Sequence, residues 1–376
     1  MPIAALDAFP VSYPEPNDHG RNRAVCLVRL TDGDGRTGWG ECTTYWPEAA
    51  VAAAVLVEAL RGHVVGKDAV ENESIMRGLR AQTWWYGTGG VGIAGFALSG
   101  LDVALWDLKG KILGARVLDL LGGPAHDTLP AIASSHATGT EIPEMAEEIA
   151  GWLATGLTGV KVGFGKLGDA NLGFEHDRDV AWMKAVREAL GPSKRIMIDC
   201  GVRNKWTVPE AVARVRAFEE YRLDWIEEPL GADDPHGYAQ LRQATQTLIA
   251  YGEREYAAAG VQRLLDTGTV DVVGLDPGRV GGVTGFALAC DLLELAKRQG
   301  NAHCWSTAID TAASLAITWA KPACKQLEEQ PFKGPMQHDL IGGAIVHKDG
   351  YMEQPQGPGL GIEVDQSVVD RYAIPR

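Results

Sequence analysis

The sequence reads RIMIDC at residues 195–200, DWIEEP at residues 224–229 and LIAYGERE at residues 248–255. Each of these segments contains a short apolar run that ends at or near an acidic residue, and the acids are Asp199, Glu227 and Glu253. Apolar runs of this length suit buried parallel strands, and the segments between them carry the spacing of helices. The stretch therefore predicts strands that alternate with helices.

The segment between the first two runs illustrates the helical spacing. Thr207 and Glu210 stand in the register of a capping box, and Val212, Val215 and Phe218 then fall on one face. When parallel strands alternate with outer helices, all strands end at the same rim. We therefore expect the three acids to converge there.

Carboxylates that converge in this way repel one another unless a cation lies between them. Oxygen ligands without a cluster of Cys and His favour Mg²⁺ over zinc. A single acid at a strand end is more simply explained as a helix cap. Three acids at matching positions, Asp199, Glu227 and Glu253, predict a magnesium site.

The alternation of strands and helices continues through most of the chain from residue 128. Eight strands are expected to end near Ser134, Lys161, Asp199, Glu227, Glu253, Asp276, His303 and Leu327. Helices are expected at 143–155, 175–190, 207–221 and 285–299. Eight such units indicate the α/β fold class and a (β/α)₈ barrel of the TIM type, with its active residues on the C-terminal rim.

The rest of the chain is expected to form a second unit. Residues 24–41 resemble a β-hairpin with Asp-Gly turns, and helices are expected at 47–60 and about 94–111. This pattern predicts an N-terminal α+β capping domain over residues 1–125 and a catalytic barrel over residues 126–340. Residues 341–376 are too few for a domain and are expected to pack on the capping domain.

Composition limits the possible partners of the chain. The 376 residues carry a formal charge of −14, which argues against nucleic acid and anionic membranes but not against a small anionic substrate. The six cysteines show no CxxC pair, so reduced thiols are expected. The N-terminal residues show no targeting pattern, and the apolar run at 49–60 is too short to span a bilayer. We expect a soluble cytoplasmic protein.

Three further residues are expected at the rim. Lys161 lies in GVKVGFGK and points inward on its strand together with Gly163, so it either binds a substrate carboxylate or acts as a base with a lowered pKa. Asp276 and His303 end neighbouring strands. A carboxylate beside an imidazole fixes its tautomer and raises its basicity, which predicts a general acid/base pair. A lone histidine in AHCWS would more often be structural.

Two loops of the capping domain are candidates for covering the site. The segments 15–23 and 43–47 hold His19, Arg21, Tyr45 and Trp46, although exposed loops of mixed composition are more often only connections. Of these we expect His19, Arg21 and Trp46 to contact the substrate. His136, which follows the first barrel strand, is a further substrate-binding candidate.

Together these motifs resemble the enolase superfamily, and within it the mandelate racemase / muconate lactonizing enzyme family. The resemblance rests on Lys161 and on IEEP, YGERE, LDPGRVGG and AHCW, and it extends to ALSGLDVALWDLKGK and PGLGIEVD. It implies that Asp199, Glu227 and Glu253 bind Mg²⁺, and that the substrate is a small carboxylate whose α-proton is removed through an enediolate. The Asp276–His303 pair would be the base.

The resemblance implies two more features. Glu329 would match the glutamate of the eighth strand that donates a hydrogen bond to the carboxylate oxygen of the substrate, with Glu328 as the adjacent alternative. Barrels of this family commonly assemble, so a homo-oligomer is expected.

The sequence departs from the racemase pattern at one position. Racemases of the family carry K-x-K on the second strand, whereas Gly163 stands at the second lysine position here. This resembles acid-sugar dehydratases, in which His303 alone would take the α-proton and then help the β-hydroxyl leave, giving a 2-keto-3-deoxy acid. Lys166 is able to occupy the vacant space, which keeps a racemase, epimerase or cycloisomerase as the alternative. A barrel that binds without catalysis is the alternative from another class.

Overall fold

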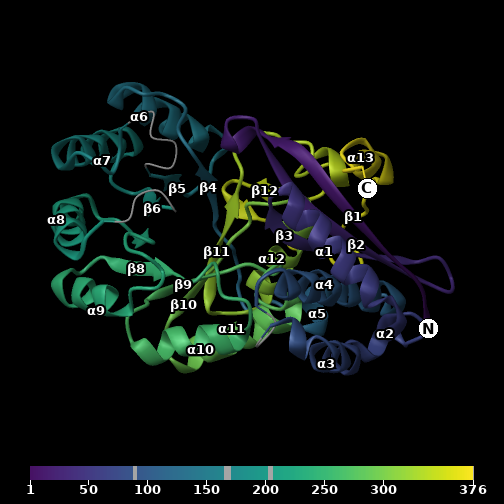
Figure 1. The fold of residues 1–376 in the computed structure, drawn as a ribbon. Coiled ribbons are helices and arrows are strands. Elements are labelled where there is room, and N and C mark those ends of the chain that lie inside the picture. Colours follow the sequence, from purple (N-terminus) through teal and green to yellow (C-terminus); the bar gives the residue numbers. More distant parts are fainter. Residues whose placement is uncertain (88–90, 165–170, 202–205, 376) are drawn as a thin grey trace.

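The computed structural model describes residues 1–87, 91–164, 171–201 and 206–375, and its centre is a closed barrel of eight parallel strands (Figure 1). The prediction of a (β/α)₈ barrel is confirmed. Around the barrel the strands follow the order β10-β11-β4-β5-β6-β7-β8-β9. Their bounds are β4 Ala131–Ser135, β5 Gly159–Gly163, β6 Arg195–Asp199, β7 Trp225–Glu227, β8 Leu248–Tyr251, β9 Val272–Leu275, β10 Gln299–Ala302 and β11 Cys324–Glu329.

The strand register brings the expected rim residues level with one another. Gly163 pairs with Asp199 across β5 and β6, and Asp199 pairs with Glu227 across β6 and β7. Deeper in the barrel, an apolar layer closes the interior. It consists of Ile132, Met197, Trp225, Ala250 and Val272. Because side chains alternate along a strand, Met197 and Asp199 share the inner face, and the apolar layer forms the floor beneath the acids.

Seven α-helices surround the barrel: α6 Ile142–Gly151, α7 His176–Leu190, α8 Val208–Phe218, α9 Pro235–Ala244, α10 Ala258–Thr267, α11 Gly282–Leu295 and α12 Ala308–Ala320. The capping box of α8 is confirmed, because the Thr207 N–H donates to Glu210 Oε2 at 2.8 Å. The helix expected at 285–299 is wrong at both ends, since α11 begins three residues earlier at the turn of Gly281 and Gln299 already opens β10.

The capping domain contains an antiparallel sheet of β1 Ile3–Glu15, β2 Arg21–Asp32 and β3 Thr37–Tyr45. The expected hairpin is β2–β3, but the sequence analysis missed β1, whose prolines are tolerated because it is an edge strand. The expected loops are consequently shorter. In the first loop, β1 extends to Glu15, a 3₁₀ turn spans Pro16–Asp18 and β2 begins at Arg21. In the second loop, β3 extends to Tyr45.

Helices cover one face of the capping sheet: α1 Pro47–Ala59, α2 Arg61–Val64, α3 Asn72–Gln82 and α4 Ile93–Leu113, with α5 Val117–Leu120 leading to the barrel. The long helix α4 lies directly on β3, because a Cβ at Gly40 would overlap the carbonyl oxygen of Gly100. Among the described residues, no helix has both the length and the apolar character that a bilayer requires.

Helix α4 also joins the capping domain to the barrel at the start of α11. Asp102 Oδ1 accepts the Thr284 N–H at 2.9 Å, and Ser99 Oγ accepts the Gly281 N–H at 3.0 Å. The Trp106 indole donates to Thr284 Oγ1 at 2.8 Å. A second joint lies at the rim, where Glu41 Oε2 accepts the Thr307 N–H at 3.1 Å. These contacts fix the capping sheet over the open end of the barrel.

The C-terminal segment contacts both units, and the N- and C-terminal ends of the chain lie on the side of the capping domain (Figure 1). The Leu360 N–H donates to Asp107 Oδ1 of α4 at 2.8 Å, and the Ser12 N–H of β1 donates to the Tyr372 carbonyl at 2.9 Å. The tail also meets the barrel, because the Ala131 N–H donates to the Gly350 carbonyl at 2.8 Å. The tail, which includes α13 Gln366–Arg371, therefore contacts the capping domain and is also anchored at the bottom of the barrel.

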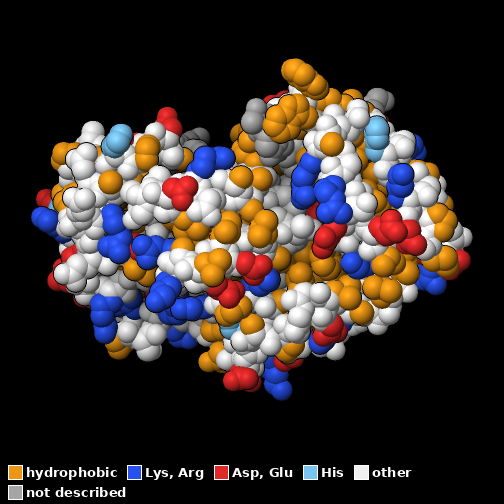
Figure 2. Space-filling model, turned by 90° about the horizontal axis from the view of Figure 1, so that it is seen from below, with side chains coloured by type: hydrophobic (Ala, Val, Ile, Leu, Met, Phe, Trp, Pro, Cys, Tyr) orange, Lys and Arg blue, Asp and Glu red, His pale blue; other side chains and the backbone are white. Residues whose placement is uncertain are grey.

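The face of the molecule seen from below carries both basic and acidic side chains (Figure 2). Figure 2 shows Lys and Arg side chains interspersed with acidic and hydrophobic ones on this face rather than gathered into one basic area. The net negative charge of the chain is thus not offset here by a continuous basic surface of the kind that binds nucleic acid.

The joint at α4 predicts a pH dependence of stability. Burial raises the pKa of Asp102 to about 6, although the Thr284 N–H opposes the rise. A carboxyl whose pKa rises on folding stabilises the fold below its unfolded pKa of about 4, and this contribution is lost as the pH rises through about 6. The variant Asp102→Asn keeps the shape of the side chain without ionising.

We compare the unfolding free energy of Asp102→Asn with that of the natural protein. As the pH rises from 4 to 7, we expect the difference to shift in favour of the variant by up to about 3 kcal/mol. Urea unfolding at several pH values measures this difference. Parallel pH profiles for the two proteins would contradict the role assigned to Asp102.

Candidate active site

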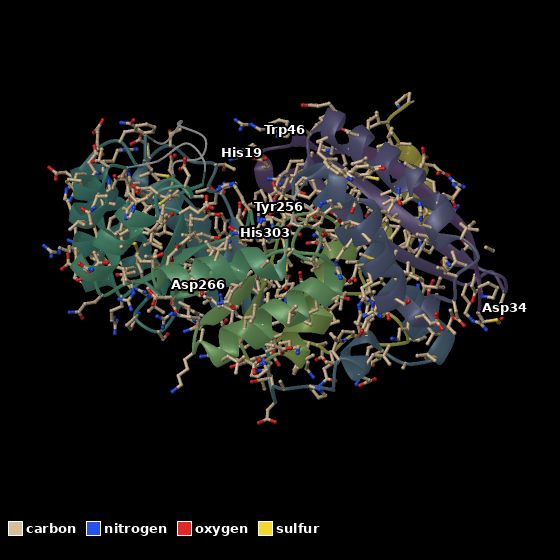
Figure 3. All side chains as sticks on the ribbon, turned by 60° about the horizontal axis from the view of Figure 1, so that its bottom comes forward. His19, Asp34, Trp46, Tyr256, Asp266 and His303 are labelled. Atoms are coloured by element: carbon tan, nitrogen blue, oxygen red, sulfur yellow. The ribbon has the colours of Figure 1, made fainter. Side chains whose placement is uncertain are left out.

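A cavity of about 580 Å³ lies at the C-terminal end of the barrel, beneath the capping domain. In Figure 3, His303 and Tyr256 lie in the middle of the molecule below Trp46, whereas Asp266 lies on α10 and Asp34 lies at the far end of the capping domain. The barrel contributes Lys161, Asp199, Glu253, Arg279 and His303, and the capping domain contributes Arg21, Arg23, Tyr45 and Trp46. The cavity is therefore shared between the two units.

Lys161 is almost fully buried among carboxylates at the base of this cavity. Its Nζ lies 2.9 Å from Glu227 Oε2, 2.7 Å from Glu328 Oε1 and 3.9 Å from Asp199 Oδ2. Burial alone would lower the pKa of Lys161, but the carboxylates of Glu227, Glu328 and Asp199 outweigh it and raise the pKa well above its usual value. Of the two roles expected from the sequence, this favours a cation that binds a carboxylate over a base with a lowered pKa.

Negative charge is nevertheless in excess around Glu227. Burial raises the pKa of Glu227 to about 8, and Asp199 and Glu253 add to the rise while Lys161 opposes it. Glu227 and Glu253 also flank the bare backbone of Gly274, where a Cβ would lie 3.3 Å from Glu227 Oε1 and 3.4 Å from Glu253 Cβ. One additional cation would relieve this repulsion.

The donor set fits Mg²⁺ in its chemistry. Asp199 and Glu227 end β6 and β7, and Glu253 lies two residues after β8. All three offer only carboxylate oxygens, which Mg²⁺ prefers. Within the described residues, no three His, Cys, Asp or Glu side chains are already arranged to hold a metal ion. The three acids would have to close further, and their role as ligands stays a prediction.

Asp276 and His303 do come together as expected. His303 Nδ1 lies 2.9 Å from Asp276 Oδ2, and Asp276 Oδ1 accepts the Gly278 N–H at 2.7 Å. Burial alone would raise the pKa of Asp276, but Arg279 and His303 outweigh it and hold the pKa below its ordinary value. An ionised Asp276 keeps a proton on His303 Nδ1 and leaves Nε2 as the basic nitrogen.

The basic nitrogen faces the cavity. His303 Nε2 lies 3.3 Å from the hydroxyl of Tyr45 and 3.6 Å from Glu253 Oε2. It therefore stands beside both the capping domain and one of the expected metal ligands. A substrate carbon held between the acids and Tyr45 would lie within reach of this nitrogen.

Two arginines of the site, Arg23 and Arg279, were not proposed from the sequence. The guanidinium groups of Arg23 and Arg279 lie 4.4 Å and 4.8 Å from the centre of the Tyr45 ring, and Tyr45 has a φ of +66°. Arg279 Nη1 also donates to the carbonyl of Glu253 at 2.9 Å. Arg279 stands in LDPGRVGG three residues after Asp276, so the turn after β9 carries a signal for it in the sequence.

The residues expected to bind the substrate do not all lie at the cavity. Arg21, Trp46 and His136 line the cavity, and their contacts with a substrate stay predictions. His19 is exposed and is absent from the cavity lining. Lys166 lies outside the described residues.

Glu329 requires a correction. Its Oε2 lies 2.6 Å from Nδ1 of His347 in the C-terminal segment, so the side chain points away from the cavity. The adjacent Glu328 is buried inside the barrel, where it contacts Lys161 and accepts from the Asn301 amide at 2.5 Å. Because side chains alternate along β11, only one of two adjacent glutamates can face inward, and here it is Glu328.

Gly163 and His136 occupy the same part of the cavity wall. A Cβ at Gly163 would overlap Nδ1 and Cε1 of the His136 imidazole. This imidazole is 5% exposed and meets the Trp305 ring edge-on, with the ring centres 4.9 Å apart. The space above Gly163 is therefore filled by a side chain from the neighbouring strand.

This overlap predicts a double-mutant coupling. We expect Gly163→Ala to lower the unfolding free energy by about 1–3 kcal/mol, because it overpacks the site. In the His136→Ala background the added methyl group has room, so the same change should cost less than about 0.5 kcal/mol. Urea unfolding of the four proteins measures the coupling, and additive effects would show that the two residues do not compete for space.

Family models for two consecutive domains match the chain. Residues 19–122 match the model described as "Mandelate racemase / muconate lactonizing enzyme, N-terminal domain", and residues 144–368 match "Enolase C-terminal domain-like". The chain belongs to the mandelate racemase / muconate lactonizing enzyme family. Its resemblance to the enolase superfamily is thereby confirmed, and the chain is an enzyme of that superfamily.

Relatives within this family share most of their length with the chain. It is 30% identical to D-galactarolactone cycloisomerase from Agrobacterium fabrum over 94% of this chain and 92% of that protein. It is also 30% identical to D-gluconate dehydratase from Thermoproteus tenax over 96% of this chain and 72% of that protein. A racemase from Streptomyces coelicolor, solved with bound magnesium, superposes with a TM-score of 0.86 at 25% identity and covers 99% of this chain and 100% of its own.

Proposed function

We propose that this enzyme is a Mg²⁺-dependent lyase that removes water from an acid sugar and yields a 2-keto-3-deoxy acid. The observation that carries the proposal is the His303–Asp276 pair at 2.9 Å, which faces a cavity where three carboxylates accumulate negative charge. Dehydratases of acid sugars among the relatives support the substrate class. Asp199, Glu227 and Glu253 would hold the ion.

The residues of this chain suit the first step of such a reaction. Lys161 offers a buried positive charge for the substrate carboxylate, and bound Mg²⁺ would supply further positive charge there. His303 Nε2 takes the proton from the α-carbon, and Asp276 stabilises the imidazolium that results. The electron pair of the broken C–H bond then forms an enediolate on the substrate.

The second step expels the oxygen on the β-carbon. The enediolate electrons form the carbon–carbon double bond, the β-hydroxyl takes a proton and leaves as water, and the enol becomes a ketone. Arg23, Arg279 and Tyr45 form a wall of donors on the side of the capping domain, where the hydroxyl groups of a sugar acid would need partners. Specificity among acid sugars would then depend on this wall.

A substrate screen tests the proposal. We would incubate the enzyme and Mg²⁺ with a panel of aldonates and aldarates, including D-gluconate, D-galactonate and D-xylonate, and detect 2-keto acids as semicarbazones. We expect at least one acid to give a product. If none does while a substrate exchanges its α-proton in D₂O and inverts, the enzyme is an isomerase and the dehydratase proposal fails.

The relative from A. fabrum supports cycloisomerisation as the second candidate, because the chain matches it over nearly its whole length. Both reactions begin with loss of an α-proton, so the same base serves either one. Mass spectrometry separates them, because dehydration removes one water from the substrate and isomerisation leaves its mass unchanged. A homo-oligomer and a cytoplasmic location stay predictions.

A further inference from the structure

The cavity holds a second imidazole, that of His136, on the part of the rim formed by β4 and β5. We infer that His136 is a second catalytic acid, which gives its proton to the oxygen that leaves the β-carbon. It takes the place of the side chain that β5 lacks at Gly163. The inference rests on the proposed function and assigns the protonation that the sequence analysis gave to His303 alone.

The His136 ring occupies the space that a side chain at position 163 would need. Lys161 and Gly163 lie on the same face of β5, and both line the cavity. Any side chain at position 163 would begin where the His136 ring now lies, because its Cβ would overlap Nδ1 and Cε1 of that ring. The imidazole therefore presents a proton-transfer group at the point where a base on β5 would otherwise emerge.

The His136 ring is held in place by Trp305. The Trp305 ring stands edge-on to it, and the Trp305 indole donates to the Ser134 carbonyl at 2.9 Å. Trp305 also contacts Arg23, whose guanidinium carbon lies 4.5 Å from the centre of the Trp305 ring. A catalytic acid must keep a fixed direction towards its oxygen, and a ring held in this way meets that need.

The two imidazoles are separated around the rim of the barrel. His303 follows β10 and His136 follows β4, and β11 lies between these strands. Proton removal and proton delivery are thus available from different parts of the cavity wall. A single histidine would have to accept the α-proton and reach the β-oxygen from one position.

The reaction steps account for every proton and electron pair that is moved. His303 Nε2 takes the α-proton, and the C–H electron pair passes into the enediolate. The enediolate electrons then form the carbon–carbon double bond as the Cβ–O bond breaks. The oxygen keeps the electron pair of that bond and takes a proton from protonated His136, which releases water. When the enol becomes a ketone, its hydroxyl proton returns to His136 and His303 gives its proton to the β-carbon, so both groups are reset.

The variant His136→Asn tests this assignment with two substrates. One is the acid sugar that the screen identifies, and the other is its 3-deoxy-3-fluoro analogue, whose fluoride leaves without a proton. We expect dehydration to fall by about 10²–10⁴-fold, which is the usual contribution of a general acid. Fluoride release, and exchange of the α-proton in D₂O, should both stay within about tenfold of the natural enzyme.

The control is His63→Asn, which alters an exposed histidine of α2 and should change none of the three rates. Equal losses of dehydration, fluoride release and exchange in His136→Asn would show a merely structural role and overturn the inference. Unchanged dehydration would overturn it as well. Failure of the natural enzyme to form a 2-keto acid from any acid sugar would instead refute the proposed function, and this inference with it.

Discussion

Replacing His303 with asparagine is expected to lower turnover by about 10²–10⁴-fold and to remove the exchange of the substrate α-proton with solvent. The imidazole Nε2 is the only basic atom of this side chain that faces the cavity, whereas Nδ1 is held by Asp276 at 2.9 Å. The asparagine amide can still donate to Asp276, so the fold should be retained. Because His303 is not an expected ligand, the binding of Mg²⁺ should also be retained.

Proton NMR in D₂O measures the exchange, and calorimetric titration measures the binding of Mg²⁺. His63→Asn again serves as the matched control, since it changes the same residue type at an exposed position of α2. Full exchange in His303→Asn would mean that another group removes the α-proton. Loss of Mg²⁺ binding together with activity would instead place His303 in the metal site.

Replacing Asp199 with asparagine is expected to weaken Mg²⁺ binding by more than about 100-fold, because even outer partners of metal ligands contribute about 10–100-fold. Turnover at fixed Mg²⁺ should fall in parallel, and chelation should reduce the activity of the natural enzyme to background. The change is close to isosteric, and the asparagine oxygen can still accept the Gly201 N–H that Asp199 Oδ1 accepts at 2.8 Å. The loss would therefore report on the negative charge.

Calorimetric titration with Mg²⁺ follows this prediction, and added Mg²⁺ should restore the chelated natural enzyme. Asp266→Asn is the control, because Asp266 is exposed on α10 and lies away from the cavity (Figure 3). Equal Mg²⁺ affinity in Asp199→Asn and the natural enzyme would exclude Asp199 as a ligand. A chelated enzyme with full turnover would exclude the metal from the reaction.

The barrel and the position of its acids were predictable from sequence. Short apolar runs that end in Asp199 and Glu227 specify parallel strands and their direction, and direction alone decides which ends share a rim. The Asp276–His303 pair followed from the same reasoning, because neighbouring parallel strands place consecutive ends side by side. These features depend on local pattern and topology only.

Other features depend on side-chain direction or on distant segments. The sequence does not say which of Glu328 and Glu329 faces inward, since a shift of one residue in strand register exchanges them. The strand β1 was missed because its pattern is interrupted by prolines that only an edge strand accommodates. The contact of Tyr45 with His303 joins positions 258 residues apart, and no local pattern encodes such a contact.

The contact between Gly163 and His136 is another feature that depends on the tertiary structure and not on a local sequence pattern. The sequence shows that Gly163 stands where racemases of the family carry a lysine, and that His136 follows a predicted strand. It does not show that the two residues are in contact. The barrel places Gly163 at the end of β5 and His136 directly after the adjacent strand β4, so the imidazole fills the space above the glycine. A missing catalytic group on one strand can thus be supplied from its neighbour.

The most direct measurement of the central claim is a crystal structure of the enzyme grown with Mn²⁺ in place of Mg²⁺ and an acid-sugar substrate, with the metal located by its anomalous scattering. We expect one metal peak bonded to Asp199, Glu227 and Glu253, with the substrate carboxylate beside it and the α-carbon facing His303 Nε2. A metal peak elsewhere, or these three carboxylates remaining apart around a substrate that His303 does not face, would contradict the account.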